Sequence, residues 1–133
     1  MIFVRKKVFF KTMHLLGVYK GVENEKRALE AILSFQQEFS WITTVRKATG
    51  IEDDNGIDIV VGTEDIGDLF VQVKSSRHGV AKYRRKHPRK MVAMVIVRKR
   101  DTDCVVWEKI KKGLLELREQ LLIQRGGEIF LSD

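Results

Sequence analysis

Cysteine, proline and histidine are scarce in this chain of 133 residues, which has one Cys (Cys104), one Pro and three His. A single cysteine cannot form an internal disulfide, which excludes a secreted domain held together by disulfides. With so few Cys and His residues, no structural zinc site is expected. No apolar run approaches the roughly 18 residues that cross a membrane, and Lys11 and His14 interrupt the N-terminal apolar residues where a signal peptide would need an unbroken core. We therefore expect a cytoplasmic protein that does not contact membranes.

Charge of one sign is concentrated in two neighbouring segments. The net charge is +7, from 25 Lys and Arg against 18 Asp and Glu. Residues 77–90 contain seven Lys or Arg and no acid, which leaves 18 bases against 18 acids elsewhere. Residues 52–68 contain seven acids and no base. An acidic block followed by a basic block suits a site that holds a cation beside a phosphate backbone, although two solvated loops would give the same pattern.

The pattern of apolar residues predicts an α/β domain with a central mixed sheet of about four to five strands flanked by helices. The expected elements are a helix at 24–39, strands at 41–47, 57–61, 69–75, 91–98 and 104–107, and a helix at 108–124. Residues 77–90 would form a basic connector. Gly126 and Gly127 would end the last helix, followed by a tail or edge strand at 129–131.

The chain is expected to contain one structural domain. Residues 20–133 form this domain, and residues 1–19 are an N-terminal extension of uncertain structure. Met13 is a second candidate for the start of the protein, which would make the residues before it an artefact. A length of 133 residues is typical of a single domain.

Three polar side chains on two expected strands are candidates for one site. Side chains alternate between the two faces of a strand, so Gln72 and Lys74 share a face and lie roughly 6.5 to 7 Å apart. On the preceding strand, Asp58 interrupts an apolar face to which Ile57 and Ile59 belong. If the two strands pair as a hairpin, a carboxylate, an amide oxygen and an ammonium group converge.

These groups suit metal-assisted hydrolysis of a phosphodiester. Hard oxygen ligands hold a divalent ion, which neutralises the phosphate and lowers the pKa of a bound water. Asp58 is the expected main ligand, and the Gln72 side-chain oxygen and the Val73 main-chain carbonyl are further candidates. Lys74 would orient the water or stabilise developing charge. Glu25, on the expected first helix, would bind the metal directly or through water.

The same residues resemble a nuclease signature. The Gly-Ile-Asp triplet at 56–58, separated by thirteen residues from the Gln-Val-Lys triplet at 72–74, is similar to the PD-(D/E)XK motif in its Q-x-K form, as in Mrr-like restriction endonucleases. The segment with Gly21 and Glu25 resembles the first helix of archaeal Holliday junction resolvases, in which a glutamate four residues after the glycine belongs to the active site. The resemblance covers residues 20–98.

The resemblance implies a restriction-endonuclease-like core of helix, three-stranded meander, helix and strand. It further implies Mg²⁺ as cofactor, with Mn²⁺ as a substitute, DNA as substrate, and a homodimer that cuts two strands with two sites. Two features depart from the family pattern. Asn55 precedes Gly56 without the Pro-Asp pair of the motif's name, and Gln72 replaces an acid, which removes one negative charge from the metal site.

Contacts with the DNA backbone are expected from the residues that follow the lysine. These candidates are Ser75, Ser76, Arg77, Lys82, Arg84, Arg85, Lys86, Arg89 and Lys90. The serines would also suit a turn at the end of a strand, and the basic residues a solvated surface. Tyr83 lies among them and is a candidate for stacking on a base.

Three functions are compatible with the sequence. The first is a Mg²⁺-dependent endodeoxyribonuclease that recognises a DNA structure, such as a junction, or a sequence. The second is a catalytically weak or inactive DNA-binding module of the same fold, and the third is an interaction subunit of a restriction or mobile-element system. The set Asp58, Lys74 and Glu25 favours the enzyme, whereas Gln72 in place of an acid favours the binding module.

Overall fold

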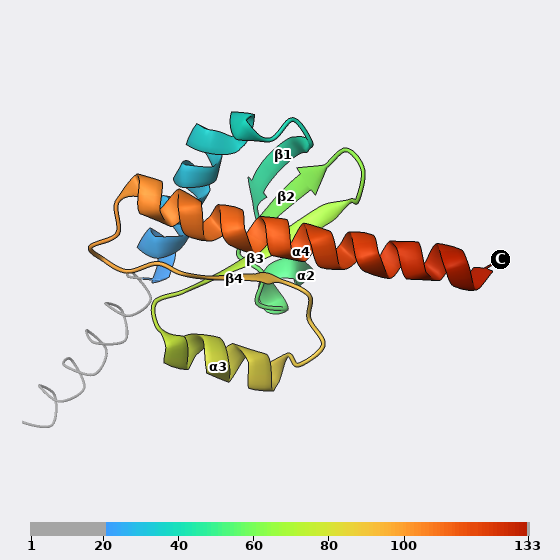
Figure 1. Cartoon of the computed structure of the whole chain (residues 1–133). Helices are drawn as coiled ribbons and strands as arrows, with labels where there is room; N and C mark the ends of the chain where they lie inside the picture. The colour runs from blue at the N-terminus through green and yellow to red at the C-terminus, as the bar shows by residue number, and fades with distance from the viewer. Residues whose placement is uncertain (1–20, 133) are drawn as a thin grey trace, which may run out of the picture.

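The computed structural model describes the backbone of residues 21–132 and the side chains of residues 21–126. The extension expected at 1–19 lies outside the described residues. Within the described part, four strands form one mixed sheet in the order β1-β2-β3-β4, flanked by helices (Figure 1). The strands are β1 (Ile42–Lys47), β2 (Ile59–Thr63), β3 (Asp68–Lys74) and β4 (Ala93–Ile96). The expected α/β class is therefore confirmed.

The first three strands form an antiparallel meander, and β4 pairs parallel to β3. Strands that run parallel need a crossover connection, which here contains helix α3 (Arg77–Lys86). A helix over residues 21–35 precedes the sheet and ends in a 3-10 turn, η1 (Gln36–Glu38). The order helix, meander, helix, strand is the one that the family resemblance implies. Membership in that family stays a prediction.

Helix α3 replaces most of the basic connector expected at 77–90, so this expectation was wrong. The Ser76 hydroxyl caps the helix by accepting a hydrogen bond of 3.2 Å from the Gly79 N–H. Val80, Tyr83 and His87 follow at spacings of three and four residues, which place them on one face of a helix. The cap and this spacing favour a helix in spite of the high density of positive charge in the segment.

Removal of the cap should measurably weaken the fold. Ser76→Ala is expected to lower the free energy of unfolding by about 1 kcal/mol, because the Gly79 N–H loses its acceptor. Urea denaturation measures the difference. Ser75→Ala is the matched control, since Ser75 is exposed and precedes the cap. Equal effects of the two substitutions would show that Ser76 does not stabilise α3 as a cap.

The fifth strand expected at 104–107 was also wrong, because these residues form the start of helix α4 (Asp103–Ser132). Thr102 accepts hydrogen bonds from Val105 N and Val106 N. Although the segment is rich in β-formers, Val106 and Trp107 enter the core together with Ile110, one helical turn later. Helical packing thus overrides local propensity.

Gly126 and Gly127 do not end α4, contrary to expectation, and the helix continues to Ser132. Gly126 does not adopt the positive φ of a helix-ending glycine. A glycine within a helix costs about 1 kcal/mol relative to alanine, which a long helix tolerates. The tail or edge strand expected at 129–131 is part of the same helix. None of the described helices has a stretch long and apolar enough to span a membrane.

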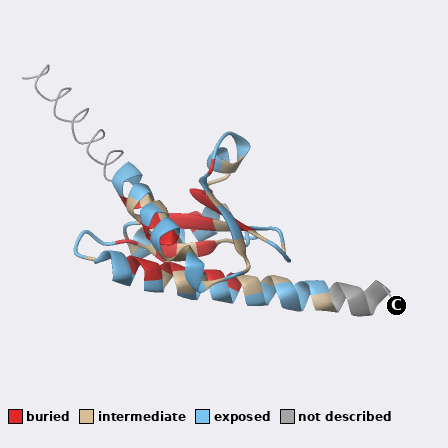
Figure 2. Ribbon diagram, turned by 90° about the horizontal axis from the view of Figure 1, so that it is seen from above, coloured by how far each residue is buried: buried red, intermediate tan, exposed pale blue. Residues whose placement is uncertain are grey.

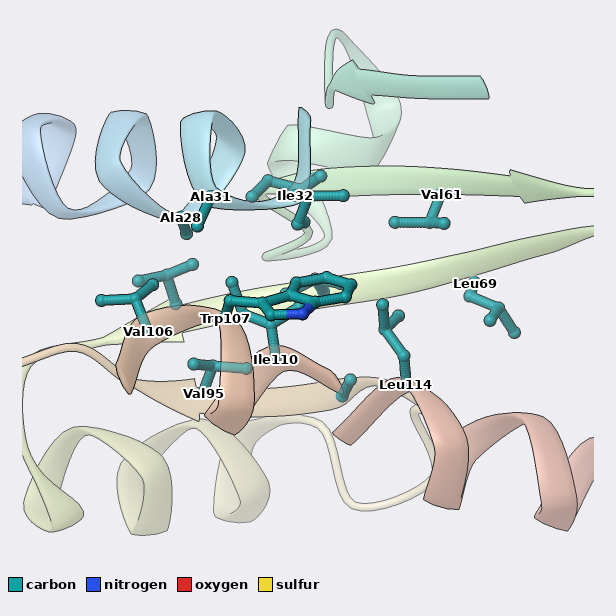
Figure 3. Close-up of a cluster of buried hydrophobic side chains, with 14 of the residues drawn as sticks. Ala28, Ala31, Ile32, Val61, Leu69, Val95, Val106, Trp107, Ile110 and Leu114 are labelled. Carbon is teal, nitrogen blue, oxygen red and sulfur yellow. The ribbon is translucent and has the colours of Figure 1, made fainter. Parts of the chain in front are cut away.

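The main core lies between one face of the sheet and two helices, the helix at 21–35 and α4. Trp107 lies among the buried side chains of this core and is 2% exposed (Figure 3). Its ring is stacked on that of Phe35, with ring centroids 5.9 Å apart. The sheet contributes alternate residues, such as Val71 and Val73 of β3. Figure 2 shows the buried residues concentrated in the strands and in the facing sides of these two helices.

The other face of the sheet carries a smaller apolar cluster formed by Ala48, Ile57 and Val60, with Phe70 packed against it. Helix α3 lies on this side, below the sheet in Figure 1. Because Phe70 faces this way, Gln72 and Lys74 do too, as the alternation of strand side chains predicts. The expected common face of Ile57 and Ile59 was wrong, since Ile59 belongs to the main core.

Candidate functional site

Asp58 lies at the point where strands β2 and β3 separate. The ladder of paired residues ends at Ile59–Val71, so Asp58 lies one residue before the first paired residue of β2. Asp58 N donates to Val71 O at 2.9 Å, which turns the chain before β2 begins. The Val73 N–H has no strand partner at this point and instead donates to the Asp58 carboxylate at 2.7 Å. The carboxylate is thus held against β3, and Asp58 as a residue is 7% exposed.

Burial raises the pKa of Asp58 from its ordinary 3.8 to about 7. The hydrogen bond from Val73 N–H acts in the opposite direction, and so does the positive charge of Lys74, whereas the Glu25 carboxylate raises the pKa further. These influences require Glu25 and Lys74 to lie close to Asp58. The structure therefore brings together the carboxylates of residues 25 and 58 and the ammonium group of residue 74.

Gln72 is 4% exposed, and its side-chain oxygen Oε1 makes no hydrogen bond with any described residue. Leaving a buried acceptor without a partner costs about 1 to 3 kcal/mol, so such atoms are rare in folded proteins. Gln72 shares its strand face with Lys74 and directly precedes Val73, whose N–H binds the Asp58 carboxylate. A carbonyl-type oxygen in this position is available to a cation or a water molecule.

Helix α3 holds the lysine in place. Tyr83 is the buried residue of this helix, and its ring centroid lies 5.5 Å from Lys74 Nζ. The Tyr83 hydroxyl donates to Asn55 O at 3.4 Å. Gly79, four residues earlier on the same helix face, lies beside the alkyl part of Lys74, and an added Cβ would make an ordinary van der Waals contact of 3.5 Å with Lys74 Cδ.

The same tyrosine explains the glycine at position 56. Gly56 has a φ of +76°, and an added Cβ would lie 2.6 Å from Tyr83 Cε2. A larger residue would therefore be strained and would displace the ring. Burial and the charge of Asp58 raise the pKa of Tyr83, which places this ring beside both Asp58 and Lys74. Tyr83 thus connects the glycine of the sequence triplet to the candidate lysine.

Glu25 and Asp58 both line a cavity of about 190 Å³ beside the start of β2. Lys26 and Lys47 are also among the residues that line it. The remaining lining is apolar and includes Leu29. Sequence reasoning did not single out Lys26 or Lys47, because neither belongs to a spacing pattern. They become neighbours of Asp58 only through the packing of the helix at 21–35 beside the start of β2.

The oxygen atoms available fit a hard divalent cation better than a zinc-type ion. Within residues 21–126, no three His, Cys, Asp or Glu side chains cluster to hold a metal. The candidate set has the carboxylates of Asp58 and Glu25 and the Gln72 oxygen. The carbonyl of Val73 points to the same side of β3 as its N–H, toward Asp58. Carboxylate, amide and main-chain oxygens are typical ligands of Mg²⁺, which retains several of its own waters.

Most of the predicted DNA-contact residues have exposed side chains. Arg77, Lys82 and the run 84–86 are exposed on α3, and Arg89 and Lys90 are exposed after it. Ser75 is exposed next to Lys74, whereas the Ser76 hydroxyl is used by the helix cap.

The role of Tyr83 beside the lysine was missed, since it was considered only for base stacking within a connector. Its spacing from Val80 and His87 was the available signal for a helix with a buried face.

Neither the family models, nor the curated proteins, nor the solved structures that we compared with this chain match it. Its function must therefore be argued from the geometry of the site.

Proposed function

We propose that this protein is a metal-dependent DNA endonuclease with a PD-(D/E)XK-type site in the Q-x-K form. The observation that carries the proposal is the buried, unbonded oxygen of Gln72, which shares a strand face with Lys74 and precedes the residue whose N–H binds the Asp58 carboxylate. Such a buried acceptor lowers the stability of the fold unless a cation or a water molecule binds it. A divalent cation is the ligand that also offsets the repulsion between the carboxylates of Asp58 and Glu25.

Each residue of the candidate site has a separate role in the proposed hydrolysis. Asp58 and Glu25 supply negative charge to hold Mg²⁺, and Gln72 Oε1 and the Val73 carbonyl supply neutral oxygens. When bound, the ion neutralises phosphate charge and makes a bound water more acidic. Lys74, held by Tyr83, is placed to orient the attacking water and to stabilise negative charge that develops on the phosphate.

The substrate and the assembly belong to the same proposal. The exposed cations of α3 follow directly after Lys74 and Ser75 in the chain, so a phosphate backbone at the site would pass along them. This charge distribution supports DNA as the substrate. By the resemblance to junction resolvases, a homodimer would place one site on each of two strands. A cytoplasmic location likewise stays a prediction.

A catalytically inactive DNA-binding module is the second candidate. It is favoured by Gln72 itself, since the site has two carboxylates where the usual motif has an additional acid. Fewer negative charges weaken the attraction for a divalent ion. This candidate has the same fold and the same basic surface as the enzyme and differs only in the absence of cleavage.

Cleavage of DNA with and without the metal tests the proposal. Wild-type protein is expected to cut duplex or four-way-junction DNA with Mg²⁺ or Mn²⁺ and not with EDTA. Asp58→Asn should lower the rate by more than roughly 100-fold, since substitutions in the shell behind metal ligands already cost 10- to 100-fold. Asp53→Asn is the matched control, because Asp53 is an exposed acid of α2 (Ile51–Asp54) outside the site.

The outcomes separate the candidates. Binding of DNA without cleavage, with either metal, would favour the inactive binding module. Absence of both binding and cleavage would leave the interaction subunit of a restriction or mobile-element system. Equal activity of Asp58→Asn and wild type would exclude Asp58 as the main metal ligand and overturn the proposed site.

A further inference from the structure

Three consecutive cations, Arg98, Lys99 and Arg100, form the turn after β4, and all three are exposed. They line an open groove of about 570 Å³ together with Ser75 and Val97. No acidic side chain is among the described residues that line it. Sequence analysis did not assign this turn, because its three charges lie outside the basic segment at 77–90.

The backbone of this turn is fixed by its neighbours. Asp101 accepts hydrogen bonds from Arg98 N at 2.9 Å and from Lys109 Nζ at 2.7 Å. Arg27, from the helix at 21–35, donates to Arg98 O at 3.1 Å and also to Asp101 O. The one acid of the turn is therefore used internally, with its side chain 10% exposed. The cationic side chains, in contrast, take part in none of the ion pairs among the described residues.

The turn lies next to the candidate lysine. Because β3 and β4 are parallel, their C-terminal ends meet at one end of the sheet, and Val97 N donates to Lys74 O at 2.9 Å. Figure 1 shows the turn after β4 and the connection from β3 to α3 at this same end. A second groove of about 440 Å³ shares Arg98 with the first and is lined by four cations, Arg77, Arg98, Lys109 and Lys112, and by one acid, Glu116. Positive charge therefore extends from the site in a direction distinct from the outer face of α3.

We infer that the turn at 98–100, together with Ser75, is a second phosphate-binding surface that holds the backbone of a nucleic acid strand next to Lys74. This inference rests on the proposed function. Exposed cations on a rigid turn bind phosphates at a low entropic cost because the backbone is already ordered. Contacts of this kind position the strand without reading its sequence. The basic face of α3 and this turn would then hold the substrate on two sides of the site.

A charge-neutral double substitution tests the inference. Lys99→Gln with Arg100→Gln should weaken binding of a labelled DNA duplex in EDTA, measured by fluorescence anisotropy at several salt concentrations. The slope of log affinity against log salt is expected to become less steep by about 1 to 2, since two phosphate contacts are lost. Thermal stability should not change, because neither side chain takes part in the ion pairs among the described residues.

The matched control is Lys111→Gln with Arg125→Gln, which removes the same charge where Lys111 pairs with Glu38 and Arg125 bonds to Asp65 O. An equal loss of affinity in both double variants would overturn the inference, since net charge alone would then explain it. If the wild type binds DNA without cutting it, and only the variant at positions 99 and 100 loses affinity, the result would support the phosphate-binding surface and overturn the nuclease proposal. If wild type binds no DNA, both proposals fail.

Discussion

Lys74→Met is expected to reduce the rate of Mg²⁺-dependent DNA cleavage by roughly 10²- to 10³-fold, the usual cost of removing one group that stabilises charge in the transition state. Lys74 Nζ lies over the Tyr83 ring and influences the pKa of Asp58, so its charge is fixed close to the candidate metal site. Single-turnover measurements with enzyme in excess isolate the chemical step from binding. The affinity for DNA should fall much less than the rate.

Methionine is chosen because its unbranched side chain can keep the packing of the lysine stem against Gly79 and Tyr83. The variant should therefore fold, which thermal denaturation verifies. Lys111→Met is the control, since Lys111 is bonded to Glu38 and lies outside the site. If Lys74→Met cuts as fast as wild type and Lys111→Met, the lysine has no part in catalysis.

In the absence of divalent ions, the wild-type protein should be less stable at pH 8 than Asp58→Asn, and this advantage of the variant should disappear at pH 4. Burial raises the pKa of Asp58 from 3.8 to about 7, so the folded protein holds this proton more tightly than the unfolded chain. The resulting stabilisation is present below pH 3.8 and is lost as the pH rises through about 7. The difference between these two pKa values corresponds to roughly 4 kcal/mol in the free energy of unfolding.

Urea denaturation in EDTA at the two pH values measures this difference. Asparagine cannot ionise but keeps an oxygen that accepts the hydrogen bond from Val73 N–H. Addition of Mg²⁺ or Mn²⁺ at pH 8 should then stabilise the wild type and leave Asp58→Asn unchanged, because an ion that binds only the folded state adds its binding free energy to stability. Asp53→Asn should follow the wild type throughout. A pH-independent difference between wild type and Asp58→Asn would contradict the assigned burial of this carboxyl group.

Two features that each lower the stability of the fold, the buried carboxylate of Asp58 and the unbonded oxygen of Gln72, belong to the same candidate site. Asp58 is a carboxylate in surroundings that disfavour its charge, and Gln72 is a buried amide with an unbonded oxygen. Most other described side chains follow the ordinary rules of an apolar core around Trp107 and of hydrogen-bonded buried polar atoms, with Arg118 Nε as a further buried atom that has no hydrogen-bond partner. Departures from these rules tend to gather at functional sites. The proximity of the two features is therefore itself an argument for a ligand between these strands.

Sequence reasoning could identify the class of fold and could name most residues of the candidate site. Alternation along β3 correctly placed Gln72 and Lys74 on one face and Val73 on the other, because a strand has a fixed period of two residues. The antiparallel pairing of β2 with β3 then brought Asp58 to the same end of the sheet. These were local rules, and they needed no knowledge of distant parts of the chain.

Tertiary structure decided the rest, because it depends on contacts between residues far apart in sequence. Segment 104–107 has strand-forming residues, yet packing of Trp107 against Phe35 makes it helical. In the sequence, Tyr83 is one residue within a basic segment. Only the packing of α3 on the sheet places its ring next to Lys74.

The surroundings of Asp58 were decided in the same way. The sequence by itself determined that a carboxylate, an amide and an ammonium would share one region. The pKa of Asp58 depends on burial and on Glu25, 33 positions earlier in the chain. The cationic turn at 98–100 reaches the site only through the parallel pairing of β4 with β3. Local periodicity determines which face a side chain takes, whereas its burial and its distant neighbours exist only after the elements have packed.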